Sequence, residues 1–170
     1  MSVAIPEQPA PGILNPGAGT QSSIVWQFAR FDELGARDAH DMFQLRAAVF
    51  VVEQTCAFQD LDGADPACWH LLGREGTKLV AYCRLVPPGV KYPEPSIGRV
   101  TSSLDWRRTG VGRALMREAI AKAEALWPRE RLRIGAQMYL KGFYESYGFA
   151  QSSEPYDEDG ILHIEMIREP

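Results

Sequence analysis

Residues 98–112 have the sequence Gly-Arg-Val-Thr-Ser-Ser-Leu-Asp-Trp-Arg-Arg-Thr-Gly-Val-Gly. This stretch predicts a strand, a turn rich in arginine and glycine, and the start of a helix. The turn is centred on Arg107-x-x-Gly110-x-Gly112, where two glycines remove side chains from the path of a ligand towards the backbone. The unpaired N–H groups at a helix start attract anions. The stretch therefore predicts a pyrophosphate site, although the turn alone is also compatible with a simple connection.

The residues around this turn support a helix and limit the kind of anion. Apolar residues recur at helical spacing from Val111 to Leu126, and Pro128 ends the pattern. Arg107, Arg108 and Arg113 could add charge-assisted hydrogen bonds to phosphate. The chain lacks the lysine of the P-loop and the three-glycine dinucleotide fingerprint. A nucleotide hydrolase and a dinucleotide enzyme are therefore not indicated.

The composition is that of an ordinary globular chain. Its 170 residues suit one domain, and 45% are hydrophobic and 24% charged. The formal net charge of −4 argues against general nucleic-acid binding. No apolar run reaches the length of a membrane span, and no secretion signal begins the sequence. We therefore expect a cytoplasmic protein that binds neither nucleic acid nor membrane.

The three cysteines do not indicate a disulfide or a metal site. Cys56, Cys68 and Cys83 form no C-x-x-C pair, and their odd number favours reduced thiols. Cys68-x-His70 could be half of a zinc site, but no second ligand pair has suitable spacing. We expect no metal.

The sequence predicts a mixed α/β domain around a single sheet, preceded by a short leader. Residues 1–22 are rich in proline and glycine and are predicted to be a disordered leader, so that the domain covers 23–170. The patterns predict helices at 38–53, 110–127 and 139–147 and strands at 24–30, 68–74, 78–86, 96–103, 131–136, 149–154 and 161–168, with the last hairpin turning at 157–160.

A second motif suggests a family. Phe143-Tyr144-x-x-x-Gly148-Phe149 follows the glycine turn by about thirty residues. Together the two motifs resemble the GNAT superfamily of acyl-CoA N-acyltransferases, over residues 24–168. The finer resemblance is to ElaA-like proteins, through the blocks Leu45-Arg46-x-x-Val49-Phe50-Val51-Val52-Glu53-Gln54, Asp60-x-Asp62, His70-Leu71 and 154–166. It implies a single, mostly antiparallel, splayed sheet flanked by helices. Arg108 departs from the pattern, because glycine is common there.

The resemblance implies an N-acetyltransferase that uses acetyl-CoA and acetylates a primary amine of a small molecule or peptide. The pyrophosphate would lie on the 107–112 turn, and the pantetheine arm would run along the 98–103 strand. A backbone N–H near residues 101–103 would polarise the thioester. The implied cofactor-binding residues are Val100, Thr101, Ser102, Arg107, Arg108, Thr109, Gly110, Val111, Gly112 and Arg113.

The resemblance also assigns the proton transfers. Tyr144 aligns with the tyrosine that protonates the leaving thiolate in many relatives, although it could instead be an aromatic core residue. Glu53 and His70 are candidate bases, and Asp60 and Asp62 are further ones. Each has a plain structural alternative: a solvated helix end for Glu53, a core histidine for His70, and turn residues for the two aspartates.

Two other functions stay open at this point. The first is a non-catalytic protein of the same fold that binds or senses acyl-CoA. The second is an acyltransferase for longer acyl groups, because a fold fixes neither the donor nor the acceptor. The sequence does not distinguish a monomer from a homodimer.

Overall fold

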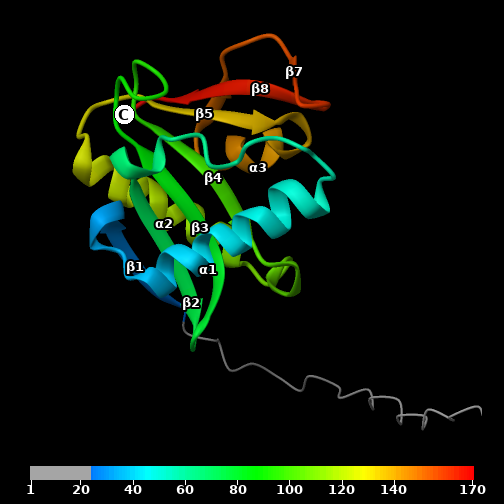
Figure 1. Ribbon diagram of the computed structural model, residues 1–170. Coiled ribbons are helices and arrows are strands. Elements are labelled where there is room, and N and C mark those ends of the chain that lie inside the picture. Colours follow the sequence, from blue (N-terminus) through cyan, green and yellow to red (C-terminus); the bar gives the residue numbers. More distant parts are fainter. Residues whose placement is uncertain (1–23) are drawn as a thin grey trace, which may run out of the picture.

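The computed structural model describes residues 24–170 and shows one eight-stranded sheet flanked by helices (Figure 1). The strand order is β1-β2-β3-β4-β5-β8-β6, and β7 also pairs with β8. All neighbours are antiparallel except β4 and β5. The strands are β1 Val25–Arg30, β2 Trp69–Glu75, β3 Lys78–Val86, β4 Ser96–Ser102, β5 Leu132–Gln137, β6 Phe149–Gln151, β7 Tyr156–Glu158 and β8 Ile161–Arg168. The predicted fold class, a mixed α/β structure with a mostly antiparallel sheet, is confirmed.

The helices cover both faces of the sheet. The α-helices are α1 Ala36–Arg46, α2 Val111–Leu126 and α3 Lys141–Glu145, joined by a π-helix at Ala47–Glu53 and 3-10 turns at Phe31–Glu33, Asp65–Ala67, Leu104–Trp106 and Met138–Leu140. Figure 1 shows α1 in front of β2 and β3 and α2 behind them. Successive strand residues point to opposite faces, so Leu71 packs in the α2 core and Leu72 in the α1 core.

The helix predicted at 38–53 changes geometry at its end. Residues 47–53 form a π-helix, which is rare and often found at functional sites. At α-helical spacing, Val49 and Val52 would lie on one apolar stripe. Val49 is buried, but Val52 is 74% exposed, because the wider π turn rotates it away from the core. The apolar stripe of this helix therefore does not continue to Val52.

The C-terminal part contains a strand that the sequence did not predict. Residues 157–160 were expected to form a turn, but Tyr156–Glu158 pairs with β8 as β7. The turn is reduced to Asp159 and Gly160, which both have positive φ, as a two-residue hairpin turn requires. The strand expected at 149–154 ends at Gln151. The helix expected at 139–147 is a 3-10 turn followed by the short α3.

Three expectations concern other properties of the chain. The leader predicted at 1–22 lies outside the described residues. Within residues 24–170, no helix is long and apolar enough to cross a membrane. In the same range, no three His, Cys, Asp or Glu side chains come together as metal ligands.

Candidate active site

The candidate active site is a cavity where the sheet divides. β4 and β5 share a single pair of register neighbours, Ser96 and Arg133, and then separate. Beyond this point, no strand formed by residues 24–170 pairs with the edge of β4 that faces β5. A cavity of about 400 Å³ fills the space, within the usual range for ligand pockets. Its walls include residues 96–102 of β4, Leu115 of α2 and Tyr144 of α3.

A β-bulge shapes the β4 wall of this cavity. The register with β3 shifts between Tyr82 and Arg84, so that Arg99 and Val100 face Cys83 alone. Arg99 has a φ of +53°, which is uncommon for a side chain other than glycine. Bulges interrupt the ladder and redirect residues next to functional sites. Here the bulge immediately precedes Thr101 and Ser102, two of the predicted cofactor-binding residues.

The turn at 107–112 presents unpaired backbone N–H groups at the start of a helix. Arg108 and Gly110 both have positive φ, of +64° and +94°, and Gly110 caps α2. The first turn of the helix leaves the N–H groups of residues 111–113 without intrahelical partners. A Cβ added at Gly112 would meet no atom within 4 Å, so there is open space beside the backbone at this position. Gly112 and Arg107 also line the cavity, which joins the turn to the β4 edge.

Arg107 and Glu53 form an ion pair at this cavity. Both carboxylate oxygens of Glu53 accept hydrogen bonds from Arg107, the Nη2–Oε2 distance being 2.7 Å. The hydrogen bonds of Glu53 raise the pKa of Arg107. The structure therefore brings two predicted site residues together, the candidate base and a candidate phosphate ligand, although they are 54 residues apart in sequence.

Tyr144 lies in the cavity wall and is largely buried. It packs edge-to-face against Phe143 and Phe149. Its hydroxyl has no hydrogen-bond partner among residues 24–170, and burial raises the pKa of Tyr144. The side chain is thus both an aromatic core residue and a cavity residue, with a hydroxyl that keeps its proton at neutral pH.

His70 lies outside the cavity. It is fully buried, and its two ring nitrogens lie 2.8 Å from the Tyr82 hydroxyl and 3.0 Å from the Asp65 carbonyl oxygen. Burial lowers the pKa of His70. His70 is therefore a core histidine whose two ring nitrogens both have hydrogen-bond partners. The structure does not bring it together with the other candidate catalytic residues.

Asp60 and Asp62, the two further candidate bases, are both held in ion pairs with arginines. Together with Asp65 and three arginines they form a closed ring in which each aspartate bridges two arginines, in the order Arg46, Asp60, Arg99, Asp62, Arg84 and Asp65. We call this set the ion-pair ring. Hydrogen bonds from Arg84 hold the pKa of Asp62 well below its usual range. The ring fixes the 54–68 loop to α1, β3 and the bulged Arg99 of β4.

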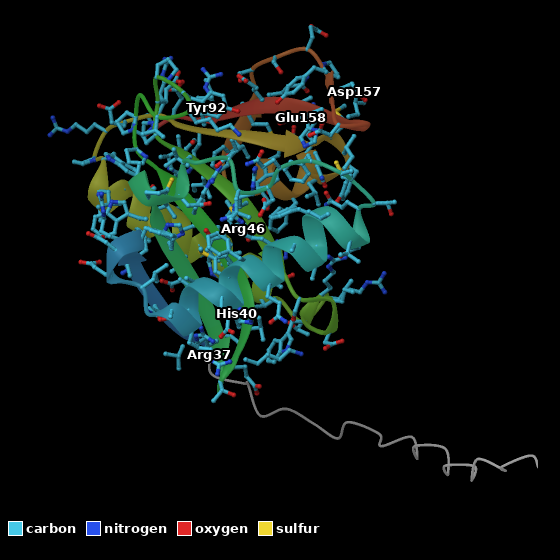
Figure 2. All side chains as sticks on the ribbon, in the orientation of Figure 1. Arg37, His40, Arg46, Tyr92, Asp157 and Glu158 are labelled. Carbon is cyan, nitrogen blue, oxygen red and sulfur yellow. The ribbon has the colours of Figure 1, made fainter. Side chains whose placement is uncertain are left out.

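Several cavity residues were not predicted from the sequence. Tyr92 of the loop between β3 and β4, Glu158 of β7 and His163 of β8 all line the cavity. In Figure 2, Tyr92 and Glu158 lie near β8, whereas Arg46 lies towards the middle of the molecule. The period-two pattern of β8 places His163 on the face opposite the buried Ile164, but the sequence does not show which face meets a cavity.

Unsatisfied polar atoms support a ligand at this place. Among residues 24–170, the buried side-chain nitrogen or oxygen atoms without partners belong to Arg84 (Nε), Thr101 (Oγ1) and Ser103 (Oγ). Buried polar groups are normally paired. Arg84 and Thr101 line the cavity, and Ser103 follows the open β4 edge directly. These atoms, the free backbone edge and the anion turn together fit an elongated ligand with amide groups and phosphate.

Comparison with known proteins agrees with this geometry. Residues 52–170 match the family model of the acetyltransferase (GNAT) domain. The chain is 45% identical to the UPF0039 protein sll0451 of Synechocystis over 85% of its own length and 94% of that protein. It is 41% identical to Protein ElaA of Escherichia coli, over 86% and 97% of the two chains.

Solved structures show the same similarity. The crystal structure of an acyl-CoA N-acyltransferase from Pseudomonas aeruginosa superposes with a TM-score of 0.83 at 38% identity, covering 86% of this chain and 99% of that one. Escherichia coli ElaA gives a TM-score of 0.82 at 40% identity, covering 86% and 100%. A GNAT acetyltransferase from Elizabethkingia anophelis, solved with acetyl-CoA bound, shares the fold at 16% identity.

Proposed function

Because the chain belongs to the GNAT acetyltransferase family, we propose that it transfers the acetyl group of acetyl-CoA to a primary amine of a small molecule or peptide. The observation that carries this proposal is the continuity of one cavity. It joins an anion turn at the start of α2, an open β4 edge and the side chain of Tyr144.

The residues that would hold the donor follow from that continuity. The N–H groups of residues 108–113 and the arginines among them would bind the pyrophosphate of acetyl-CoA. The free edge of β4 at Val100, Thr101 and Ser102 would pair with the amide groups of the pantetheine arm, as an added strand does. Bound acetyl-CoA supplies an activated acyl group, a thioester with a good leaving group.

The chain itself would handle polarisation and protons. A backbone N–H near residues 101–103, just after the bulge, would donate to the thioester oxygen as charge develops on it. Tyr144 would protonate the departing sulfur, because its raised pKa keeps the hydroxyl protonated. Glu53 lines the cavity as the predicted base, but Arg107 holds both its oxygens.

The experiment that tests the proposal is a screen of primary amines and short peptides with acetyl-CoA, monitored by the release of free thiol. We expect turnover with at least one acceptor, and a mass increase of that acceptor by one acetyl group. If CoA binds but thiol is not released with any amine, the proposed activity is wrong and a protein that senses acyl-CoA is indicated. Faster turnover with longer acyl-CoA donors would change the proposed acyl group, but the proposed acyl transfer to an amine would stand.

A further inference from the structure

His163 occupies a wall of the cavity for which the sequence predicted no residue. Side chains along β8 alternate between two faces, and Ile164 and Met166 are fully buried in the core that packs against α2. Ile161 and His163 point the other way and line the cavity. In the sheet, His163 lies beside Gln137 of β5, which is also a cavity residue.

One hydrogen bond of His163 determines which ring nitrogen carries the hydrogen in the neutral ring. Its Nδ1 lies 2.8 Å from the carbonyl oxygen of Ile161. A carbonyl oxygen only accepts, so Nδ1 carries the hydrogen, and in the neutral ring Nε2 then holds a lone pair. Nε2 has no hydrogen-bond partner among the described residues. The ring stacks on Tyr156 at a centroid distance of 6.1 Å, and the side chain is 14% exposed.

We infer that His163 is the general base that accepts a proton from the acceptor amine through Nε2. This inference rests on the proposed acetyl transfer and gives His163 a role that the family resemblance did not assign to it. It also identifies the β5–β8 side of the cavity as the place where the amine binds.

Other candidate bases are less suited to this task. Both oxygens of Glu53 accept hydrogen bonds from Arg107, and both nitrogens of His70 are engaged away from the cavity. Glu158 and Asp159 are exposed carboxylates. An ordinary carboxylate is a weaker base than imidazole, and catalysis is most efficient with a base that titrates near neutral pH.

The proton and electron balance of the step is as follows. Nε2 of His163 takes one proton from the ammonium form of the acceptor and leaves a neutral amine. The amine lone pair forms a bond to the thioester carbon, and the carbon–sulfur bond then breaks, with its electron pair going to sulfur. A second proton from the nitrogen replaces the one that Tyr144 gives to sulfur. The imidazolium finally releases its proton to water, so that one proton is released per amide formed.

One carboxylate lies close to the ring of His163. Glu158 of β7 places Oε2 3.9 Å from Nδ1, close enough for charge attraction without a hydrogen bond. Tyr156 is uncharged at neutral pH, because burial raises its pKa to about 12. Gln137 is neutral, and Lys91 of the loop between β3 and β4 also lines the cavity and interacts with Glu158. Glu158 therefore faces Nδ1, the nitrogen of the ring that does not accept the proton.

The test uses His163→Asn in the full chain. Asparagine places an amide N–H near the position of Nδ1 and so keeps the bond to the Ile161 carbonyl, but it has no equivalent of Nε2. With an acceptor found by thiol release, we expect kcat to fall about 100-fold or more, while the affinity for acetyl-CoA stays unchanged. His40→Asn, on the exposed face of α1, is the matched control and should keep wild-type rates.

The pH profile separates a base from a structural residue. Wild-type kcat/KM should fall on the acid side as the imidazole becomes protonated, and His163→Asn should lose this limb. Free imidazole should restore part of the activity of the variant. Unchanged kcat and an unchanged acid limb in His163→Asn would overturn the inference, while acetyl transfer itself would stand.

A second measurement does not depend on finding the acceptor. Long-range nitrogen–proton correlation spectra of labelled histidine rings distinguish the two neutral tautomers. The inference predicts that the His163 signal, assigned by its loss in His163→Asn, shows a hydrogen on Nδ1 and a bare Nε2. A hydrogen on Nε2 would overturn the inference even if no amine had yet been acetylated.

Discussion

Replacing Asp65 by asparagine should destabilise the fold strongly, because this side chain closes the ion-pair ring. Oδ1 of Asp65 lies 2.8 Å from Nη1 of Arg46 and 3.0 Å from Nη1 of Arg84. The three side chains are 5% exposed or less. Asparagine keeps the shape and an acceptor oxygen but removes the negative charge. The ring then holds three guanidinium groups against two carboxylates.

The expected loss follows from the burial of the two arginines. Removing one partner of a buried ion pair costs about 3–5 kcal/mol, because the remaining charge stays buried without compensation. Domains are usually stable by only about 5–15 kcal/mol. With an m-value of about 2 kcal/mol per molar urea, a loss of 4 kcal/mol lowers the midpoint of unfolding by about 2 M.

Equilibrium urea unfolding measures this loss. The control is Asp105→Asn, which breaks an exposed pair with Lys78 and should cost about 1 kcal/mol or less. If Asp65→Asn changed the free energy of unfolding no more than this control, the ring would not stabilise the fold. Burial would raise the pKa of Asp65, but its contacts with Arg46 and Arg84 outweigh this and lower it. The ring therefore stabilises the protein above about pH 4 and loses this effect as the pH falls further.

Three further predictions concern the turn, the proposed acid and the thiols. Arg108→Gly should raise the free energy of unfolding by about 0.5–1 kcal/mol, because it relieves a positive φ; an unchanged or lower melting temperature would contradict this. Tyr144→Phe should lower kcat about 100-fold without weakening acetyl-CoA binding, and unchanged turnover would remove Tyr144 from the mechanism. Cys68 and Cys83 should not react with a disulfide reagent at pH 8 until the protein unfolds, because both are fully buried and burial raises the pKa of Cys68 to about 11. Rapid reaction of all three thiols in the folded protein would contradict the prediction that Cys68 and Cys83 are protected by burial.

Local patterns predicted most of the fold. Strands β3 and β8 have the bounds that alternation and flanking turns indicate, and α2 differs by one residue at each end. The failures have physical causes. The spacing of Val49 and Val52 fits an α-helix, and nothing in the side chains signals the π turn that separates them. Asp159-Gly160 is a hairpin signal, but the neighbouring carboxylates made the whole segment resemble a solvated loop.

The site was predictable only where it is local. The turn at 107–112 needs glycines and a helix start, which a sequence displays directly. The partner of Arg107 is a carboxylate from a distant helix, and the position of His163 depends on how β8 packs beside β5. Such contacts arise from tertiary structure. His70 and Asp60 were candidate bases because of their residue types. The structure instead buries both as structural groups.

The most direct test of the account is a calorimetric titration of CoA into wild-type protein and Gly112→Glu. A Cβ at Gly112 has free space, and a carboxylate in the first turn of a helix is favourable, so the free variant should be as stable as wild type. The new carboxylate would lie where the pyrophosphate should bind. We expect CoA affinity to fall about 100-fold or more, whereas Arg117→Gln, an exposed change of equal charge on α2, should alter it less than about three-fold. Equal CoA binding by Gly112→Glu and wild type would contradict the central claim that this turn anchors the donor.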